Sequence, residues 1–195
     1  MLSFRVYTST SSGLPVWALR LVAELEAADL RAESIAEALR PQQLNWQPRL
    51  GAWSVGHCLE HLYNANQVYL PAISAALKGR QEVVQEIRLG WFSRWFIRNY
   101  IAPNPEGPRA RAPRKIEPAK NVESGILAVF LRSNQAAREL VRRASEYDVN
   151  AIRFKNPLIP LLRFTVGTGL EIITKHQSRH LLQAEGVRGS AGFPP

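Results

Sequence analysis

Apolar residues recur at helical spacing in four long stretches of the chain, separated by segments rich in proline, glycine and polar residues. An apolar residue every three to four positions predicts a helix that buries one face and exposes the other. We expect these helices to span residues 14–39, 54–77, 121–146 and 168–185. Few segments alternate polar and apolar residues as strands do. The pattern therefore predicts an all-α fold, an up-and-down four-helix bundle.

Residues at the expected helix ends support three of these assignments. Pro15 suits a first helical turn, where its missing amide proton is not needed. Ser54 is placed to cap the second helix. Thr168 and Glu171 have the spacing of a capping box, in which each side chain accepts a hydrogen bond from a free backbone amide, so we expect them to open the last helix. Gly186 is expected to end it.

Prolines interrupt the helical pattern in two places. Pro71 lies inside the second helix and removes one backbone hydrogen bond, which predicts a kink or a break near Tyr69. Five prolines lie in residues 103–118, so this segment cannot be helical. We expect it to form an extended crossover between the second and third long helices, linking two antiparallel helix pairs. The segment also contains four basic residues, Arg109, Arg111, Arg114 and Lys115.

An aromatic and basic stretch, residues 91–100, precedes the crossover and is expected to form a short helix. Its aromatic residues are Trp91, Phe92, Trp95, Phe96 and Tyr100, and its basic residues are Arg94 and Arg98. One interpretation is a non-enzymatic binding module, in which the rings stack on bases or rest on an anionic membrane surface while the basic residues contact phosphates. The other is that the rings cover the side of the bundle and the arginines are solvated. No recognised nucleic-acid reader motif is present, which weighs against the first.

The length and composition indicate one globular domain. The chain has 195 residues, of which 46% are hydrophobic and 21% charged. We expect an N-terminal extension over residues 1–13, the bundle over residues 14–188 and a tail over residues 189–195. The formal net charge of +9 attracts anionic partners, but a solvated basic surface is the preferred explanation, because charge alone says little about binding.

Cysteine use and hydropathy predict a cytoplasmic location. Cys58 is the single cysteine, so no internal disulfide can form and a reducing compartment is expected. Packing as a small buried hydrophobe is its expected role. No apolar run is long enough to span a membrane, and the first residues lack the apolar core of a secretion signal.

The four histidines form two pairs at a spacing of four residues, each pair on an expected helix. The pairs are His57 with His61 and His176 with His180. Residues four apart lie on one helix face, so two imidazoles there can bind one divalent cation, and a neighbouring helix can supply a third. Imidazole suits zinc, nickel, copper or iron(II). Spacing alone does not choose between His57 and His61, and packed or surface histidines remain the alternative for each pair.

Two segments resemble motifs of the DinB/YfiT-like superfamily. Residues 51–62, Gly-Ala-Trp-Ser-Val-Gly-His-Cys-Leu-Glu-His-Leu, resemble its second-helix motif, and the upstream Asn-Trp-Gln-Pro of residues 45–48 resembles its entry loop. Residues 174–183, which contain the second histidine pair, are similar to its last-helix motif. The resemblance extends over about residues 21–187 and implies a four-helix bundle in which three histidines bind a divalent metal.

The resemblance assigns the metal ligands by position. They are His61, His176 and His180, with zinc, nickel or iron as the expected metal. His57 falls where the family pattern has no ligand, which leaves it as a fourth ligand, a group that orients a ligand, or a polar residue at the core edge. Asn64 and Gln183, one turn beyond His61 and His180, are candidates for orienting a bound group, or make ordinary hydrogen bonds.

The same resemblance suggests several reactions. It implies a small-molecule substrate and either a thiol-dependent S-transferase or isomerase, with a low-molecular-weight thiol as cofactor, or a metal-dependent hydrolase. We also expect a homodimer. Residues 91–120 form a longer and more basic insert than a minimal family member needs, so they are expected to cover the mouth of the site or to form an oligomer contact.

Overall fold

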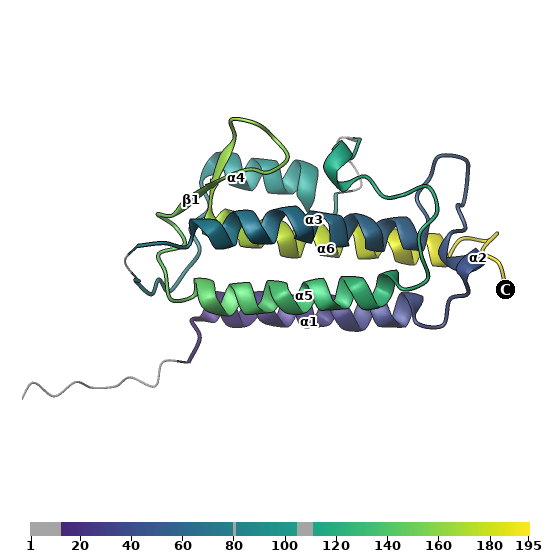
Figure 1. Cartoon of the computed structure of the whole chain (residues 1–195), viewed down its shortest axis with the longest axis horizontal. Coiled ribbons are helices and arrows are strands. Elements are labelled where there is room, and N and C mark those ends of the chain that lie inside the picture. Colours follow the sequence, from purple (N-terminus) through teal and green to yellow (C-terminus); the bar gives the residue numbers. More distant parts are fainter. Residues whose placement is uncertain (1–12, 80, 105–110) are drawn as a thin grey trace, which may run out of the picture.

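Four long helices form the body of the computed structural model, which describes residues 13–79, 81–104 and 111–195 (Figure 1). They are α1 (Val16–Ala36), α3 (Val55–Ala76), α5 (Ile126–Ala144) and α6 (Val166–Arg188). The predicted four-helix bundle is therefore confirmed. Almost all of the expected N-terminal extension and residues 105–110 of the expected crossover lie outside the described residues. None of the described helices has both the length and the apolar character needed to cross a membrane.

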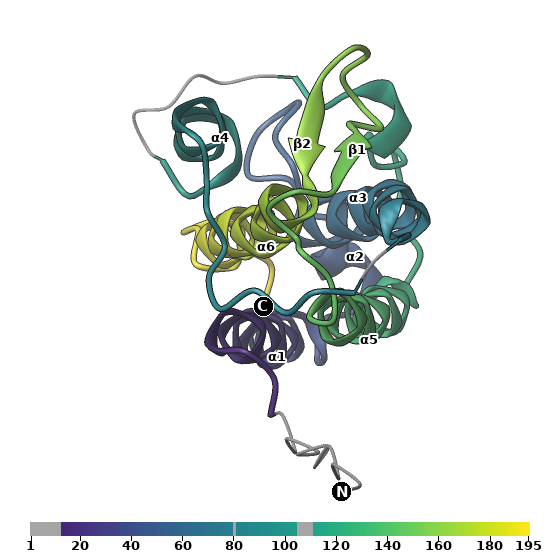
Figure 2. The same ribbon diagram turned by 90° about the vertical axis from the view of Figure 1, so that its left-hand side faces the viewer.

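The helices are arranged so that α1 and α3 occupy diagonal corners of the bundle, with α5 and α6 between them (Figure 2). Side-chain contacts give the directions. Asn66 bonds to Ser133 and Ser74 bonds to Arg143, so α3 and α5 run parallel. In the ion pairs between α1 and α6, the residue numbers rise together along both helices, so α1 and α6 also run parallel. The connection from α3 to α5 thus links two antiparallel pairs, and the members of each pair are diagonal rather than adjacent.

The two ends of α6 differ from the prediction. Thr165, not Thr168, is the N-cap, because its side chain accepts a hydrogen bond from the Thr168 amide at 3.2 Å. Glu171 is therefore not a capping residue and instead forms an ion pair with Arg20. The helix also continues past Gly186, since Arg188 bonds to backbone carbonyls at the end of α1 and holds the final turn in place.

The other helices match the prediction more closely. Ser54 caps α3 as expected, accepting from the His57 amide at 3.1 Å. Of the kink or break predicted near Tyr69, the break is wrong, because α3 runs without interruption through Pro71, which is exposed. The helix α5 begins five residues later than predicted. Asn45 takes up both the amide and the carbonyl of Val122, which keeps that residue out of the helix.

Smaller elements occupy the connections. A short helix α2 (Pro41–Leu44) precedes α3. Between α3 and α5 lie α4 (Trp91–Phe96), a π-helix η1 (Ile97–Ile101) and a 3-10 turn η2 (Arg114–Ile116). Two strands that the sequence did not predict, β1 (Arg153–Lys155) and β2 (Arg163–Thr165), form an antiparallel hairpin before α6. We call residues 88–104, 111–120 and 150–165 the cap, because α4, η2 and the hairpin lie over α3 and α6 (Figures 1 and 2).

The interior consists of two apolar clusters with a polar layer between them. One cluster surrounds Ile73 and the other surrounds Leu59. In the layer, Asn134 bonds to Gln177 at 2.9 Å and to Asp29 at 2.7 Å, so α5 is tied to α6 and to α1. Because buried amides can bond only to fitting partners, this layer sets the axial position of the helices relative to one another.

Candidate metal centre

Three histidines from two antiparallel helices meet below the cap. His61 comes from α3, and His176 and His180 come from adjacent turns of α6. Their ring centroids are 4.6–4.8 Å apart, and the Nε2 atoms of His61 and His176 are 3.1 Å apart. One ligand atom from each residue lies within 4.8 Å of the other two. A tetrahedral zinc ion with Zn–N bonds of about 2.0–2.1 Å requires N···N distances of about 3.3 Å, so the donors fit a divalent cation.

Hydrogen bonds fix the orientation of two of these rings. Nδ1 of His61 lies 2.7 Å from the carbonyl oxygen of Ile116, and Nδ1 of His180 lies 3.0 Å from Oε1 of Gln183. Because both partners are acceptors, we assign the proton to Nδ1 in each ring. The lone pair is then on Nε2. In His61 this is the atom that faces the other histidines of the cluster. Trp53 packs against both rings, at centroid distances of 4.7 and 5.4 Å, and limits their rotation.

Burial keeps all three imidazoles neutral near neutral pH. It lowers the pKa of His61 to about 4, against a small opposing effect of the Ile116 carbonyl. It also lowers the pKa of His180 to about 3, with a contribution from repulsion by His61. The pKa of His176 is depressed for the same reason. Since a metal binds the neutral form of imidazole, the site does not have to release protons before it binds a cation at pH 7.

The histidines form part of the wall of a cavity of about 780 Å³. Four aromatic residues from the cap line it, Phe92, Trp95, Phe96 and Tyr100, and so do residues 158–162 of the hairpin loop. The charged lining residues are Arg111 and Arg179, and no carboxylate is among the described residues of the wall. The cap thus forms a predominantly apolar chamber directly against the three imidazoles.

The remaining predicted site residues occupy different positions. His57 is buried at the start of α3, where its Nδ1 accepts from the Ser54 amide at 3.0 Å and its Nε2 lies 3.3 Å from the Lys120 carbonyl. It does not join the three-histidine cluster. Asn64 bonds to the carbonyl of Glu117 at 3.4 Å and contacts none of the three rings, whereas Gln183 holds His180.

Cys58 is fully buried, and burial raises the pKa of its thiol, so it remains a protonated apolar side chain.

Sequence reasoning missed two contacts that shape the centre. In the sequence, Trp53 stands out only as part of a motif. In the structure it lies directly before the Ser54 cap and packs against the His61 and His180 rings. The sequence could not predict the contact of the Ile116 carbonyl with His61, because every residue has the same backbone oxygen. Only the path of the cap brings this one to His61. The aromatic residues of 91–100 form a wall of the cavity. Binding of nucleic acid or of a membrane by this stretch stays the less favoured alternative, which nothing in the structure tests.

Fold and donor set together define a four-helix bundle protein with a three-histidine centre. The model of the DinB superfamily matches residues 24–184, and the chain belongs to this family. The solved structure of YfiT from Bacillus subtilis is similar with a TM-score of 0.61 and 16% sequence identity, covering 96% of this chain and 95% of that one. That protein is described as a probable metal-dependent hydrolase with an unusual four-helix bundle topology. No curated protein sequence matches the chain.

Proposed function

We propose that His61, His176 and His180 bind one divalent cation and that the chain is a metal-dependent enzyme acting on a small molecule in the adjoining cavity. The observation that carries this proposal is the convergence of three neutral imidazoles on one point, with two of the rings fixed by hydrogen bonds at Nδ1. Imidazole donors favour zinc, nickel or iron(II). Three protein ligands also leave a coordination position open, as in catalytic rather than structural sites.

A divalent cation held here would act as a Lewis acid and lower the pKa of a bound water or thiol. The protein supplies the surroundings. Trp53 and the Ile116 carbonyl hold the His61 ring, and Gln183 holds the His180 ring. The aromatic wall of the cap limits access of bulk water, which strengthens electrostatic interactions inside the cavity.

Hydrolysis is the first candidate reaction, by similarity of fold to a protein described as a probable metal-dependent hydrolase. A specific observation favours transfer or isomerisation with a low-molecular-weight thiol as the second. No carboxylate is present in the described part of the cavity wall to accept a proton from water. A thiol, with an ordinary pKa of about 8.5, loses its proton far more readily than water does.

Metal analysis tests the binding site. The untagged chain, supplied with zinc, nickel or iron(II) and then desalted, should retain close to one metal ion per molecule. His61→Gln and His180→Gln should lose it, whereas His57→Gln, a matched change at the histidine outside the cluster, should keep it. Wild-type protein without stoichiometric metal, or equal loss in His57→Gln, would contradict the proposal.

Activity assays separate the two candidate reactions. The metal-loaded chain is incubated with a panel of aryl esters and amides without thiol, and with aryl halides in the presence of glutathione, bacillithiol or mycothiol. Turnover of the first set alone supports hydrolysis, and thiol-dependent turnover of the second supports S-transfer. In either case His61→Gln should abolish the reaction, and activity that survives this change would rule out the proposed centre.

A further inference from the structure

The charge of the protein is concentrated in the cap. Residues 88–104, 111–120 and 150–165 contain ten Lys and Arg against one Glu, a formal charge of +9. All other residues together contain fifteen of each sign, so the cap carries the whole net charge of the chain. Since these described stretches lie over the α3 and α6 helices and form much of the cavity wall, an approaching anion is attracted to the face that leads to the cavity.

Arg179 differs from the other half-buried cations of the described structure. These are Arg31, Arg138 and Lys175, and each pairs with a carboxylate of another helix. Arg179 has no carboxylate partner among the described residues and donates only to the carbonyl of Ala102, at 3.3 Å. A partly desolvated guanidinium without a counter-ion is unfavourable, and a bound anion would compensate for it.

The position of Arg179 brings that cation to the candidate metal centre. It lies three residues after His176 on α6, lines the same cavity, and its positive charge contributes to the lowered pKa of both His176 and His180. Arg111, the other charged lining residue, is exposed and already paired with Glu117 at 3.2 Å. Among the described residues of the wall, Arg179 is therefore the cation that is available to a ligand.

We propose that the cavity binds an amphipathic carboxylate, whose apolar body lies against the aromatic wall of the cap and whose carboxylate pairs with Arg179. A cavity of about 780 Å³ accepts a molecule with one or two rings or a medium-length chain. Guanidinium and carboxylate form two parallel hydrogen bonds, so the pairing orients the ligand as well as binding it. This inference rests on the proposed function for the reaction that the ligand would undergo. Binding of the carboxylate by Arg179 does not require the metal.

A pair of fluorescent probes tests the proposal. Dansylglycine and dansylglycinamide share the same apolar body, and only the first is a carboxylate. We expect the full chain, freed of metal by a chelator, to bind dansylglycine at least about tenfold more tightly than the amide. Arg179→Met should remove this preference and leave the affinity for the amide unchanged, while Arg179→Lys should retain part of it.

A matched change on the outside of the cap controls for overall charge. Arg153 is exposed on β1 and does not line the cavity, so Arg153→Met removes the same charge but should keep the preference at high salt. Thermal unfolding of each variant checks that it is folded. An unchanged preference in Arg179→Met, or equal binding of both probes by the wild type, overturns the proposal.

Repeating the titrations with zinc and with His61→Gln separates this inference from the metal centre. A preference that is present without metal and lost in Arg179→Met supports the carboxylate site even if no metal binds. A preference that appears only with zinc and survives in Arg179→Met assigns the carboxylate to the metal and overturns the role of Arg179.

Discussion

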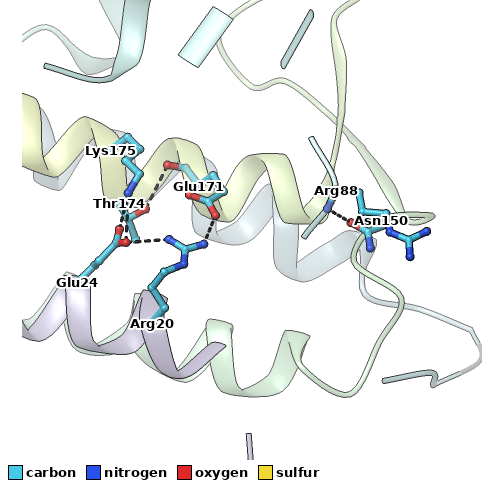
Figure 3. A network of polar contacts seen from close by, with 7 residues as sticks. All are labelled: Arg20, Glu24, Arg88, Asn150, Glu171, Thr174 and Lys175. Carbon is cyan, nitrogen blue, oxygen red and sulfur yellow. Dashed lines mark hydrogen bonds and ion pairs between the residues drawn. The ribbon is translucent and has the colours of Figure 1, made fainter. Parts of the chain in front are cut away.

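The two long sides of α6 serve different purposes. The side toward α1 consists of closed ion pairs, with Arg20 bonded to Glu171 and Lys175 bonded to Glu24 (Figure 3). The side toward α3 and the cap presents two histidines of the cluster and the guanidinium of Arg179, for which the described part of the chain offers no carboxylate partner. One helix thus satisfies its polar groups within the protein on one side and presents them to a cavity on the other. Mutations on the side toward α1 are therefore expected to change stability, and mutations on the cavity side are expected to change metal and ligand binding.

The largest expected effect concerns the cavity side. Zinc should raise the melting temperature of the wild type, because a ligand present at about 100 times its Kd stabilises the folded state by roughly 2.7 kcal/mol. The shift should vanish in His180→Gln and remain in Glu171→Gln, a change on the opposite side of the same helix. Differential scanning fluorimetry with and without zinc measures both, and a shift that persists in His180→Gln would show that the metal binds elsewhere.

A somewhat smaller effect is expected for the polar layer that connects the two sides. Asn134→Ala leaves the buried Gln177 amide without a partner and removes one hydrogen bond to Asp29, which keeps its ion pair with Arg138, so the free energy of unfolding should fall by about 2 kcal/mol. Gln135→Ala, at the exposed neighbouring position, is the control and should cost little. Urea unfolding distinguishes the two, and equal effects would show that the layer contributes no specific stability.

The third prediction concerns pH and the metal-free protein. The pKa values of His61 and His180 fall from 6.5 to about 4 and about 3 on folding, so below pH 6.5 the unfolded chain binds protons that the folded chain does not. Stability should therefore be full above about pH 7 and decrease, by on the order of 1 kcal/mol, as the pH falls to about 6. Chemical denaturation over this range measures the decrease, which should be smaller in His61→Gln. A flat profile would mean that the histidines are solvated.

The smallest effect is expected on the α1 side. Arg20→Met removes two ion pairs of an exposed guanidinium, one with the partly exposed Glu24 and one with the buried Glu171, and ion pairs screened by solvent in this way contribute roughly 0.2–1 kcal/mol each. The loss should shrink at high salt, and zinc binding should be unchanged. Urea titrations at two salt concentrations test this. A large loss of zinc affinity in Arg20→Met would show that the two sides of α6 are coupled.

Much of the bundle, but less of the site, is predictable from the sequence. Apolar periodicity locates all four long helices, and the spacing of His176 and His180 places two rings on one face of a helix. The start of α6 is predicted wrongly because Thr165 and Thr168 both suit a cap, and only the end of the hairpin decides between them. The hairpin itself has strands of three residues, too short for an alternating pattern to be visible.

The sequence also could not predict that Arg179 has no carboxylate partner among the described residues. A sequence shows where the charges are, but their pairing depends on which helices are neighbours. Lys175 and Arg179 are four residues apart on α6, yet one faces Glu24 of α1 and the other lines the cavity. The diagonal placement of α1 and α3 produces this difference, and periodicity says nothing about it.

The contact between His61 and His176 joins residues 115 positions apart in the chain. Closing so long a loop costs conformational entropy, and neither histidine pair gains its partner until the last helix has docked. A growing polypeptide that lacks its final helix therefore contains no three-imidazole cluster, however well its earlier helices have formed. Tight metal binding would then occur only after the last helix has been synthesised and has docked. The free energy of metal binding would stabilise only the folded chain that contains this helix.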